Sequence, residues 1–220
     1  MVLTRKEILD NIREGKLKFE PMIDGFQIQP HAVDLRLGKE FYIPKQWKIT
    51  KNGREVITID PFDNHDTQNF EKVELEFGQY FELLPGEFVI AKTLEAIALT
   101  SKNLMAILFP RSSINRRGLA VDLSGIIDTG YEGCLMIPIM NNTSKQVIRI
   151  YPAERICQVI FQTLSTNLSD VEISQHGLHS AKYTKSQEGF VGGRSDKKDE
   201  IDLIRLGKLD ELKTKYRVEL

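Results

Sequence analysis

The stretch GIIDTGYEGCLMIP, residues 125–138, joins two apolar runs through a turn that contains Gly130 and Gly133. Short apolar runs separated by turn residues are typical of antiparallel β structure. Asp128 stands where the first run ends, and Pro138 falls inside the second run. A carboxylate in that place either hydrogen-bonds its own turn or activates a water molecule beside a bound substrate. The stretch therefore predicts a β-rich fold and leaves both roles open for Asp128.

The same pattern extends on both sides of this stretch, from about residue 30 to about residue 165, in runs such as VDLRL, FVIAK, LMAILF and RICQVIFQ. It favours an antiparallel sandwich or barrel over alternating strands and helices. Before it, Thr4 and Glu7 form a capping box that predicts an N-terminal helix, which Gly15 ends. One further short helix is predicted around SSINRR.

The sequence changes character after Leu164, and this change predicts three segments. Residues 1–164 form the β domain with its N-terminal helix. Residues 165–196 are rich in Ser, Gly, Lys and Gln and are predicted to be a mobile tail that carries a glycine-rich motif. Residues 197–220 regain a helical pattern and are predicted to be a helical extension, with apolar positions at Ile201, Ile204, Leu209 and Leu212.

Composition excludes several classes of protein. The chain has 220 residues, 41% of them apolar, and a formal net charge of -1. It therefore has no global field that would attract nucleic acid or an acidic membrane surface. Cys134 and Cys157 lie in apolar runs and are predicted to be buried free thiols. The N-terminus lacks the apolar core of a signal peptide, and we expect a cytoplasmic protein.

The segment PRSSINRRG, residues 110–118, is the strongest candidate for an anion site. Two serines at the start of a helix offer hydroxyl groups and free backbone N–H groups. Guanidinium groups suit phosphate oxygens, and three arginines lie here: Arg111, Arg116 and Arg117. A capped surface helix with solvated arginines explains the same residues.

Three other segments place polar residues in unusual settings. Asp34 in HAVDLRLG lies between two apolar residues, and Arg155 and Gln158 interrupt the apolar run ERICQVIF. The segment SQEGFVGG, residues 186–193, offers glycines that allow a close backbone approach and Phe190, which could cover a flat ring. A solvent-facing strand position and a flexible linker are the plain alternatives.

Taken in order, HAVDLRLG, PRSSINRRG, GIIDTGYEG, ERICQ and GFVGG resemble the five motifs of the trimeric dUTPase and dCTP deaminase superfamily. The resemblance spans residues 31–193. It implies a mainly β fold, a distorted jelly-roll-like antiparallel β-barrel with few short helices. It also implies a homotrimer that binds a deoxypyrimidine nucleoside triphosphate between subunits, with no nucleic acid or membrane partner.

The two branches of this superfamily leave different marks on the sequence. The N-terminal helix, IQPHAVDLRLG and LLPGEFVIAKT (83–93) resemble the deaminase branch. Deaminases of the family carry a glutamate ten residues beyond the motif-three Asp, where this chain has Pro138. Asp128 and Tyr131 instead resemble the dUTPase motif. We therefore expect a dUTP diphosphatase that hydrolyses dUTP to dUMP and pyrophosphate.

The resemblance also implies roles for individual residues. Asp128 would activate the water that attacks the α-phosphorus, and Tyr131 would pack on the deoxyribose. A Mg²⁺ ion on the three phosphates would contact Asp34 through water. The remaining substrate-binding residues would be Arg111, Ser112, Ser113, Arg116, Asp122, Gly125, Gln158, Lys182, Gln187 and Phe190.

One departure keeps other activities open. The dUTPase motif usually has an Asn six residues before the Asp, and this chain has Asp122 there. An ionised carboxylate only accepts hydrogen bonds and so suits an amino group such as that of cytosine. The alternatives are a dCTP-directed enzyme, either a dCTP deaminase or a dCTP pyrophosphatase, and a nucleotide-binding regulator without turnover.

Overall fold

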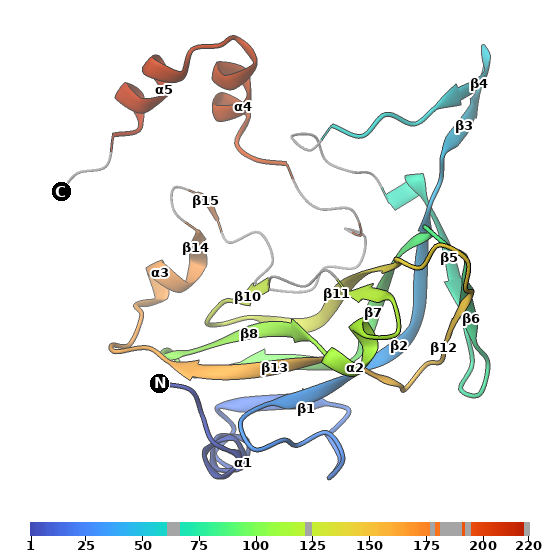
Figure 1. Cartoon of the computed structure of the whole chain (residues 1–220). Coiled ribbons are helices and arrows are strands. Elements are labelled where there is room, and N and C mark those ends of the chain that lie inside the picture. The colour runs from blue at the N-terminus through green and yellow to red at the C-terminus, as the bar shows by residue number, and fades with distance from the viewer. Residues whose placement is uncertain (61–66, 122–124, 177–178, 181–190, 192–194, 218–220) are drawn as a thin grey trace. The chain divides into compact units, whose positions relative to one another are not determined.

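The computed structural model describes all residues except 61–66, 122–124, 177–178, 181–190, 192–194 and 218–220. It divides into two compact units (Figure 1). Unit 1 comprises residues 1–44 and 71–188, and unit 2 comprises residues 45–70 and 189–220. The division into 1–164, 165–196 and 197–220 stays a prediction.

Unit 1 is built on one curled sheet (Figure 1) with the strand order β10-β8-β13-β2-β7-β11-β9, and every pairing along this path is antiparallel. β1 adds to β7, and β5 adds to β2. The predicted mainly β, antiparallel fold is confirmed. The strands are β1 (Leu17–Glu20), β2 (Val33–Pro44), β5 (Phe70–Glu74), β7 (Phe88–Leu99), β8 (Leu104–Pro110), β9 (Leu119–Val121), β10 (Gly125–Ile127), β11 (Glu132–Asn141) and β13 (Arg155–Thr163).

Smaller elements complete unit 1. β6 (Phe81–Leu83) pairs with β12 (Ile148–Ile150), and β14 (Gln175–His176) pairs with β15 (His179–Ser180). The helices are α1 (Arg5–Arg13), α2 (Ser112–Asn115) and α3 (Asp170–Ser174). Both halves of the predicted capping box at Thr4 and Glu7 are formed in α1.

The core of unit 1 lies on the inner face of the curled sheet. Side chains alternate between the two faces of a strand, and β7 follows this rule with buried residues at every second position from Ala91 to Leu99. Aromatic rings from different strands meet in the core: Phe41 stacks on Phe81 with ring centroids 5.0 Å apart, and Phe19 meets Phe161 edge-on at 6.2 Å. Burial of this apolar surface is what stabilises the sheet.

Strand β2 changes partners along its length, and this change positions the candidate site. Its first part pairs with β13, and from Leu37 onward it pairs with β7. Gly38 lies at the crossing, where a Cβ atom would stand 2.7 Å from the carbonyl oxygen of Lys92. Only glycine allows the two backbones to approach this closely.

Unit 2 contains a hairpin of β3 (Trp47–Thr50) and β4 (Gly53–Val56), a 3-10 turn η1 (Thr67–Asn69), and the helices α4 (Lys198–Arg205) and α5 (Leu209–Lys215). Gly207, with φ of 70°, lies between the two helices. Arg205 of α4 forms an ion pair of 2.7 Å with Asp60. No helix in the described part of the chain is long and apolar enough to cross a membrane.

Candidate functional site

The centre of the candidate site is the carboxylate of Asp34, which is 2% exposed. Its Oδ2 atom lies 3.2 Å from Nε of Arg111 and 3.1 Å from Nη1 of Arg155. Nε2 of Gln29 also donates a hydrogen bond to the same oxygen at 3.3 Å. We call Asp34, Arg111 and Arg155 the arginine cluster.

Strand register explains why these residues meet. β13 runs antiparallel to β2 with Gln158 opposite Asp34, and antiparallel to β8 with Gln158 opposite Phe109. Arg111 follows directly after β8, and its Nη1 donates to the carbonyl oxygen of Arg155 at 2.8 Å. The sheet therefore assembles residues from three of the predicted motifs around one carboxylate.

Charge and burial act against each other in the arginine cluster. Burial raises the pKa of the Asp34 carboxyl above its ordinary value, and the positive charges of Arg111 and Arg155 offset only part of that rise. Two guanidinium groups against one carboxylate leave an excess of one positive charge. Each guanidinium carries five N–H donors, more than these contacts use. The cluster is therefore suited to an anionic ligand that brings further acceptors.

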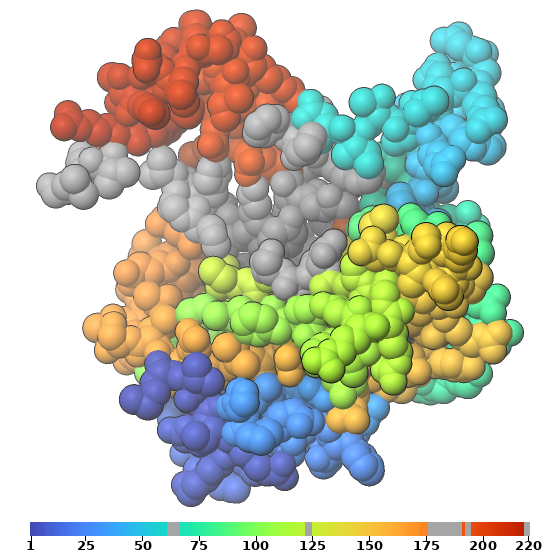
Figure 2. Space-filling model, in the orientation of Figure 1, coloured from blue at the N-terminus to red at the C-terminus, as the bar shows by residue number. Residues whose placement is uncertain are grey.

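Helix α2 carries the predicted phosphate-binding side chains next to the arginine cluster. Ser112 and Arg116 are exposed, whereas Ser113 is half-buried. The segment that includes α2 reaches the surface in the space-filling view (Figure 2). The predicted short helix is confirmed, and its first residue adjoins Arg111.

The turn that carries Asp128 lies elsewhere on the sheet. Gly125 and Ile127 of β10 pair with β8, and Asp128 follows β10. β10 is separated from β2 by β8 and β13, about 14 Å of sheet, and Asp128 lies about 13 Å further along the strands than Asp34. Strand pairing within one chain does not bring these two carboxylates together.

Tyr131 directly precedes β11, the strand that follows this turn, and Pro138 lies within that strand. Tyr131 is 9% exposed, and its hydroxyl donates to the carbonyl oxygen of Cys134 at 2.8 Å. Pro138 stands opposite Ile90 of β7, and its neighbours Ile137 and Ile139 are fully buried. No acid–base group therefore stands at position 138.

Four predicted residues lie outside the described residues: Asp122, Lys182, Gln187 and Phe190. The described residues contain no group of three or more His, Cys, Asp and Glu side chains that is placed to hold a metal ion. A magnesium ion at Asp34 would therefore take its ligands chiefly from phosphate oxygens and water, as Mg²⁺ commonly does.

Some residues of the site escaped the sequence-based list. Arg155 interrupts an apolar strand, which is a usable signal, but the sequence does not show that it faces Asp34. Glu95 is an acid at one of the alternating buried positions of β7, and Gln27 lies in a loop with no distinctive sequence pattern. Both side chains are almost completely buried. Both cysteines are free, as predicted; Cys157 is buried as expected, whereas Cys134 is only half-buried.

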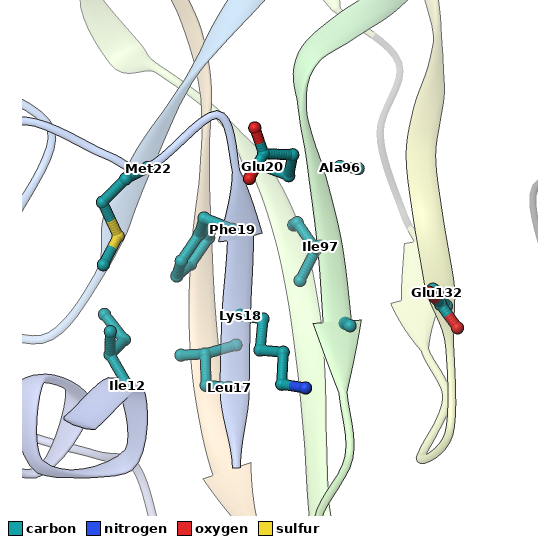
Figure 3. A pocket seen from close by; sticks show the side chains of 10 residues that line it. Ile12, Leu17, Lys18, Phe19, Glu20, Met22, Ala96, Ile97 and Glu132 are labelled. Atoms are coloured by element: carbon teal, nitrogen blue, oxygen red, sulfur yellow. The ribbon is translucent and has the colours of Figure 1, made fainter. Parts of the chain in front are cut away.

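A separate hollow lies where β1 meets α1 and β7 (Figure 3). Leu17 and Phe19 point from β1 toward Ile12 and Met22, whereas Lys18 lies on the other side of the strand. None of the residues that line the hollow is among the predicted site residues; they are Ile12, Leu17, Lys18, Phe19, Glu20, Met22, Ala96, Ile97, Ala98 and Glu132.

Known proteins are similar in sequence to most of this chain. The family model described as dCTP deaminase-like matches residues 2–164. A protein of Methanosphaera stadtmanae named dCTP deaminase, dUMP-forming, is 34% identical over 213 residues, 94% of this chain and 99% of that protein. The chain belongs to the dCTP deaminase-like family. A family member of the same name from Dictyoglomus thermophilum is 35% identical and covers 88% of this chain and 94% of its own.

A solved structure supports the fold of this family. The 2′-deoxycytidine 5′-triphosphate deaminase from Agrobacterium tumefaciens matches with a TM-score of 0.57 and 24% identity over 78% of this chain. The match covers 50% of that longer chain. The predicted membership in the dUTPase and dCTP deaminase superfamily is confirmed by the family match.

The expected assignment as a dUTP diphosphatase was wrong. Relatives that match most of the chain carry the name dCTP deaminase, dUMP-forming. The error has a physical reason: the roles expected of Asp128 and Tyr131 concern the α-phosphate and the deoxyribose. dUTP and dCTP share both groups, so these two residues do not tell the bases apart.

We expect Asp34→Asn to destabilise the protein by about 2 kcal/mol, because two charge-assisted contacts are lost in a buried place. The loss should be larger at low salt, where the two guanidinium groups repel each other with less screening. Thermal melting at two salt concentrations measures both effects.

Asp10→Asn is the matched control. Asp10 also lies between two basic side chains, Lys6 and Arg13, but at the surface, and we expect little change. Equal melting temperatures for Asp34→Asn and the wild type would contradict the claim that the arginine cluster stabilises the fold.

Proposed function

We propose that the protein is a dCTP-directed enzyme that forms dUMP. The observation that carries this proposal is the match to the Methanosphaera stadtmanae dCTP deaminase, dUMP-forming, which leaves almost no part of either chain uncovered. The geometry agrees with it, because the arginine cluster offers excess positive charge to an anion such as a triphosphate.

Conversion of dCTP to dUMP requires two hydrolytic steps. In one, water replaces the amino group at C4 of cytosine, and ammonia leaves. In the other, water attacks the α-phosphorus, the bond to the β-phosphate breaks, and pyrophosphate leaves. Asp128 is the proposed base for the second step, since a carboxylate can orient and deprotonate the attacking water.

The arginine cluster and α2 supply the proposed phosphate contacts. Arg111 and Gln158 lie in and beside the cluster, and Ser112, Ser113 and Arg116 lie on or next to α2. Mg²⁺ is proposed to neutralise the triphosphate, with Asp34 in contact through water. For the base and sugar we propose Asp122, Gly125, Tyr131 and Phe190, and we propose that Lys182 and Gln187 reach the phosphates.

A homotrimer with sites between subunits completes the proposal. Asp128 and the arginine cluster are separated within one chain by two intervening strands. A second copy could supply the Asp128 turn to the arginine cluster of the first. This arrangement would place the water-activating carboxylate beside the α-phosphate that the arginines hold.

Pro138 favours a second candidate, a dCTP pyrophosphatase that releases dCMP and retains the amino group. Proline offers no proton, and the adjacent side chains of Ile137 and Ile139 are buried and apolar. Deamination at C4 needs a group that moves protons. This candidate uses the same phosphate contacts and the same base, Asp128.

Incubation with Mg²⁺ and dCTP separates the candidates when ammonia and pyrophosphate are measured independently. The main proposal predicts both products in equal amounts, together with dUMP. Pyrophosphate and dCMP without ammonia would support the second candidate instead. The absence of both products would contradict both candidates and would favour a regulator if dCTP still binds.

The second candidate makes its own prediction for position 138. Pro138→Glu should gain ammonia release from dCTP, because a carboxylate would then face the place where the family resemblance puts the proton shuttle. Pro138→Gln is the matched control, since it has similar size without an acid, and it should release none. Ammonia from the wild type, or from both variants alike, would contradict the second candidate.

A further inference from the structure

Glu95 of β7 is a buried carboxylate that has no part in the proposed chemistry. It is 1% exposed, and burial raises the pKa of its carboxyl. Its Oε1 accepts a hydrogen bond from Nε2 of Gln27 at 2.7 Å, and its Oε2 accepts one from the backbone N–H of Arg36 at 2.9 Å. Burial of a carboxylate is costly, and these bonds offset part of the cost.

The bond to Arg36 lies at the point where β2 changes partners. Residues 33–36 of β2 pair with β13, and Leu37 is the first to pair with β7, opposite Thr93. Glu95 reaches back from β7 to the last residue of the β13-paired part. It therefore links β7 to the part of β2 that carries Asp34.

Gln27 extends this link to the loop before β2. Its Nε2 also donates to the backbone carbonyl oxygen of Asp34 at 3.0 Å. The backbone carbonyl oxygen of Gln27 accepts from the backbone N–H of Asp34 at 2.8 Å. Gln27 is itself 2% exposed. The side chain of Gln27 thus fixes the loop of residues 24–29 against β2, and its hydrogen bond to Glu95 fixes that side chain.

The same loop contacts the arginine cluster directly. The carbonyl oxygen of Phe26 accepts a hydrogen bond from Nη1 of Arg155 at 2.6 Å. Gln29 donates to Oδ2 of Asp34. Any displacement of residues 24–29 would therefore move contacts of both Arg155 and Asp34.

We propose that Glu95 is a positioning residue for the arginine cluster and acts through Gln27 and the loop of residues 24–29. It sets the guanidinium groups of Arg111 and Arg155 where they meet a triphosphate. The inference rests on the proposed function in one respect, that the ligand of the cluster is the triphosphate of a nucleotide. It assigns Glu95 to phosphate affinity and leaves the chemistry at the base untouched.

Glu95→Gln tests this role. The carboxylate accepts hydrogen bonds from two N–H donors, those of Gln27 and Arg36, and the amide would place its own N–H group against one of them. We expect the dissociation constant for inorganic triphosphate and the KM for dCTP to rise about tenfold, as displaced supporting contacts commonly cause. We expect kcat and the dissociation constant for deoxycytidine to change much less. Calorimetry gives the two dissociation constants without turnover.

Glu40→Gln is the matched control. Glu40 is a half-buried glutamate of β2 that bonds to Tyr42 and lies near Lys72 and Lys92, away from the arginine cluster. It should leave triphosphate binding unchanged. If Glu95→Gln does not fold, the double variant Glu95→Met with Gln27→Met serves in its place. It removes both side chains of the Glu95–Gln27 hydrogen bond, so that neither is left in the interior without the other.

Two results would overturn the proposal. One is unchanged triphosphate binding in a folded variant. The other is an equal loss of triphosphate and deoxycytidine binding, which would indicate general damage to the fold. A wild type that binds triphosphate but does not turn over dCTP would refute the proposed function and leave the positioning role testable.

Discussion

The contact of the Asp34 carboxylate with Arg111 and Arg155 is the interaction on which the candidate site depends. A carboxylate with 2% exposure requires partners, because burial of an unpaired charge is costly. The two arginines meet that need and keep donors for a ligand. They come from different strand ends, so their meeting also requires the antiparallel register of β8, β13 and β2.

The fold places the candidate site residues in three separate regions of the sheet. The arginine cluster and α2 lie at one part of the sheet, and the turn of Asp128 lies at another. Position 138, on β11, is a third place and holds a proline that pairs opposite Ile90. Under the proposed function, position 138 can therefore change without altering the contacts proposed for the triphosphate.

The sequence was sufficient for the β-rich fold and α1, because alternation and capping are local properties that neighbouring residues encode. It was also sufficient for the superfamily. It was not sufficient for the substrate, because the roles expected of Asp128 and Tyr131 concern groups that dUTP and dCTP share. It missed Gln27 and Glu95, whose pairing joins residues 68 positions apart and depends on where β2 passes from β13 to β7. No local pattern marks such a long-range contact.

The central claim is that the arginine cluster holds the triphosphate of dCTP. The most direct test is a crystal structure with dCTP whose bridging oxygen between the α- and β-phosphates is replaced by NH, which blocks hydrolysis. We predict phosphate oxygens within about 3 Å of the guanidinium groups of both Arg111 and Arg155. A triphosphate bound without contact to either arginine would contradict the claim.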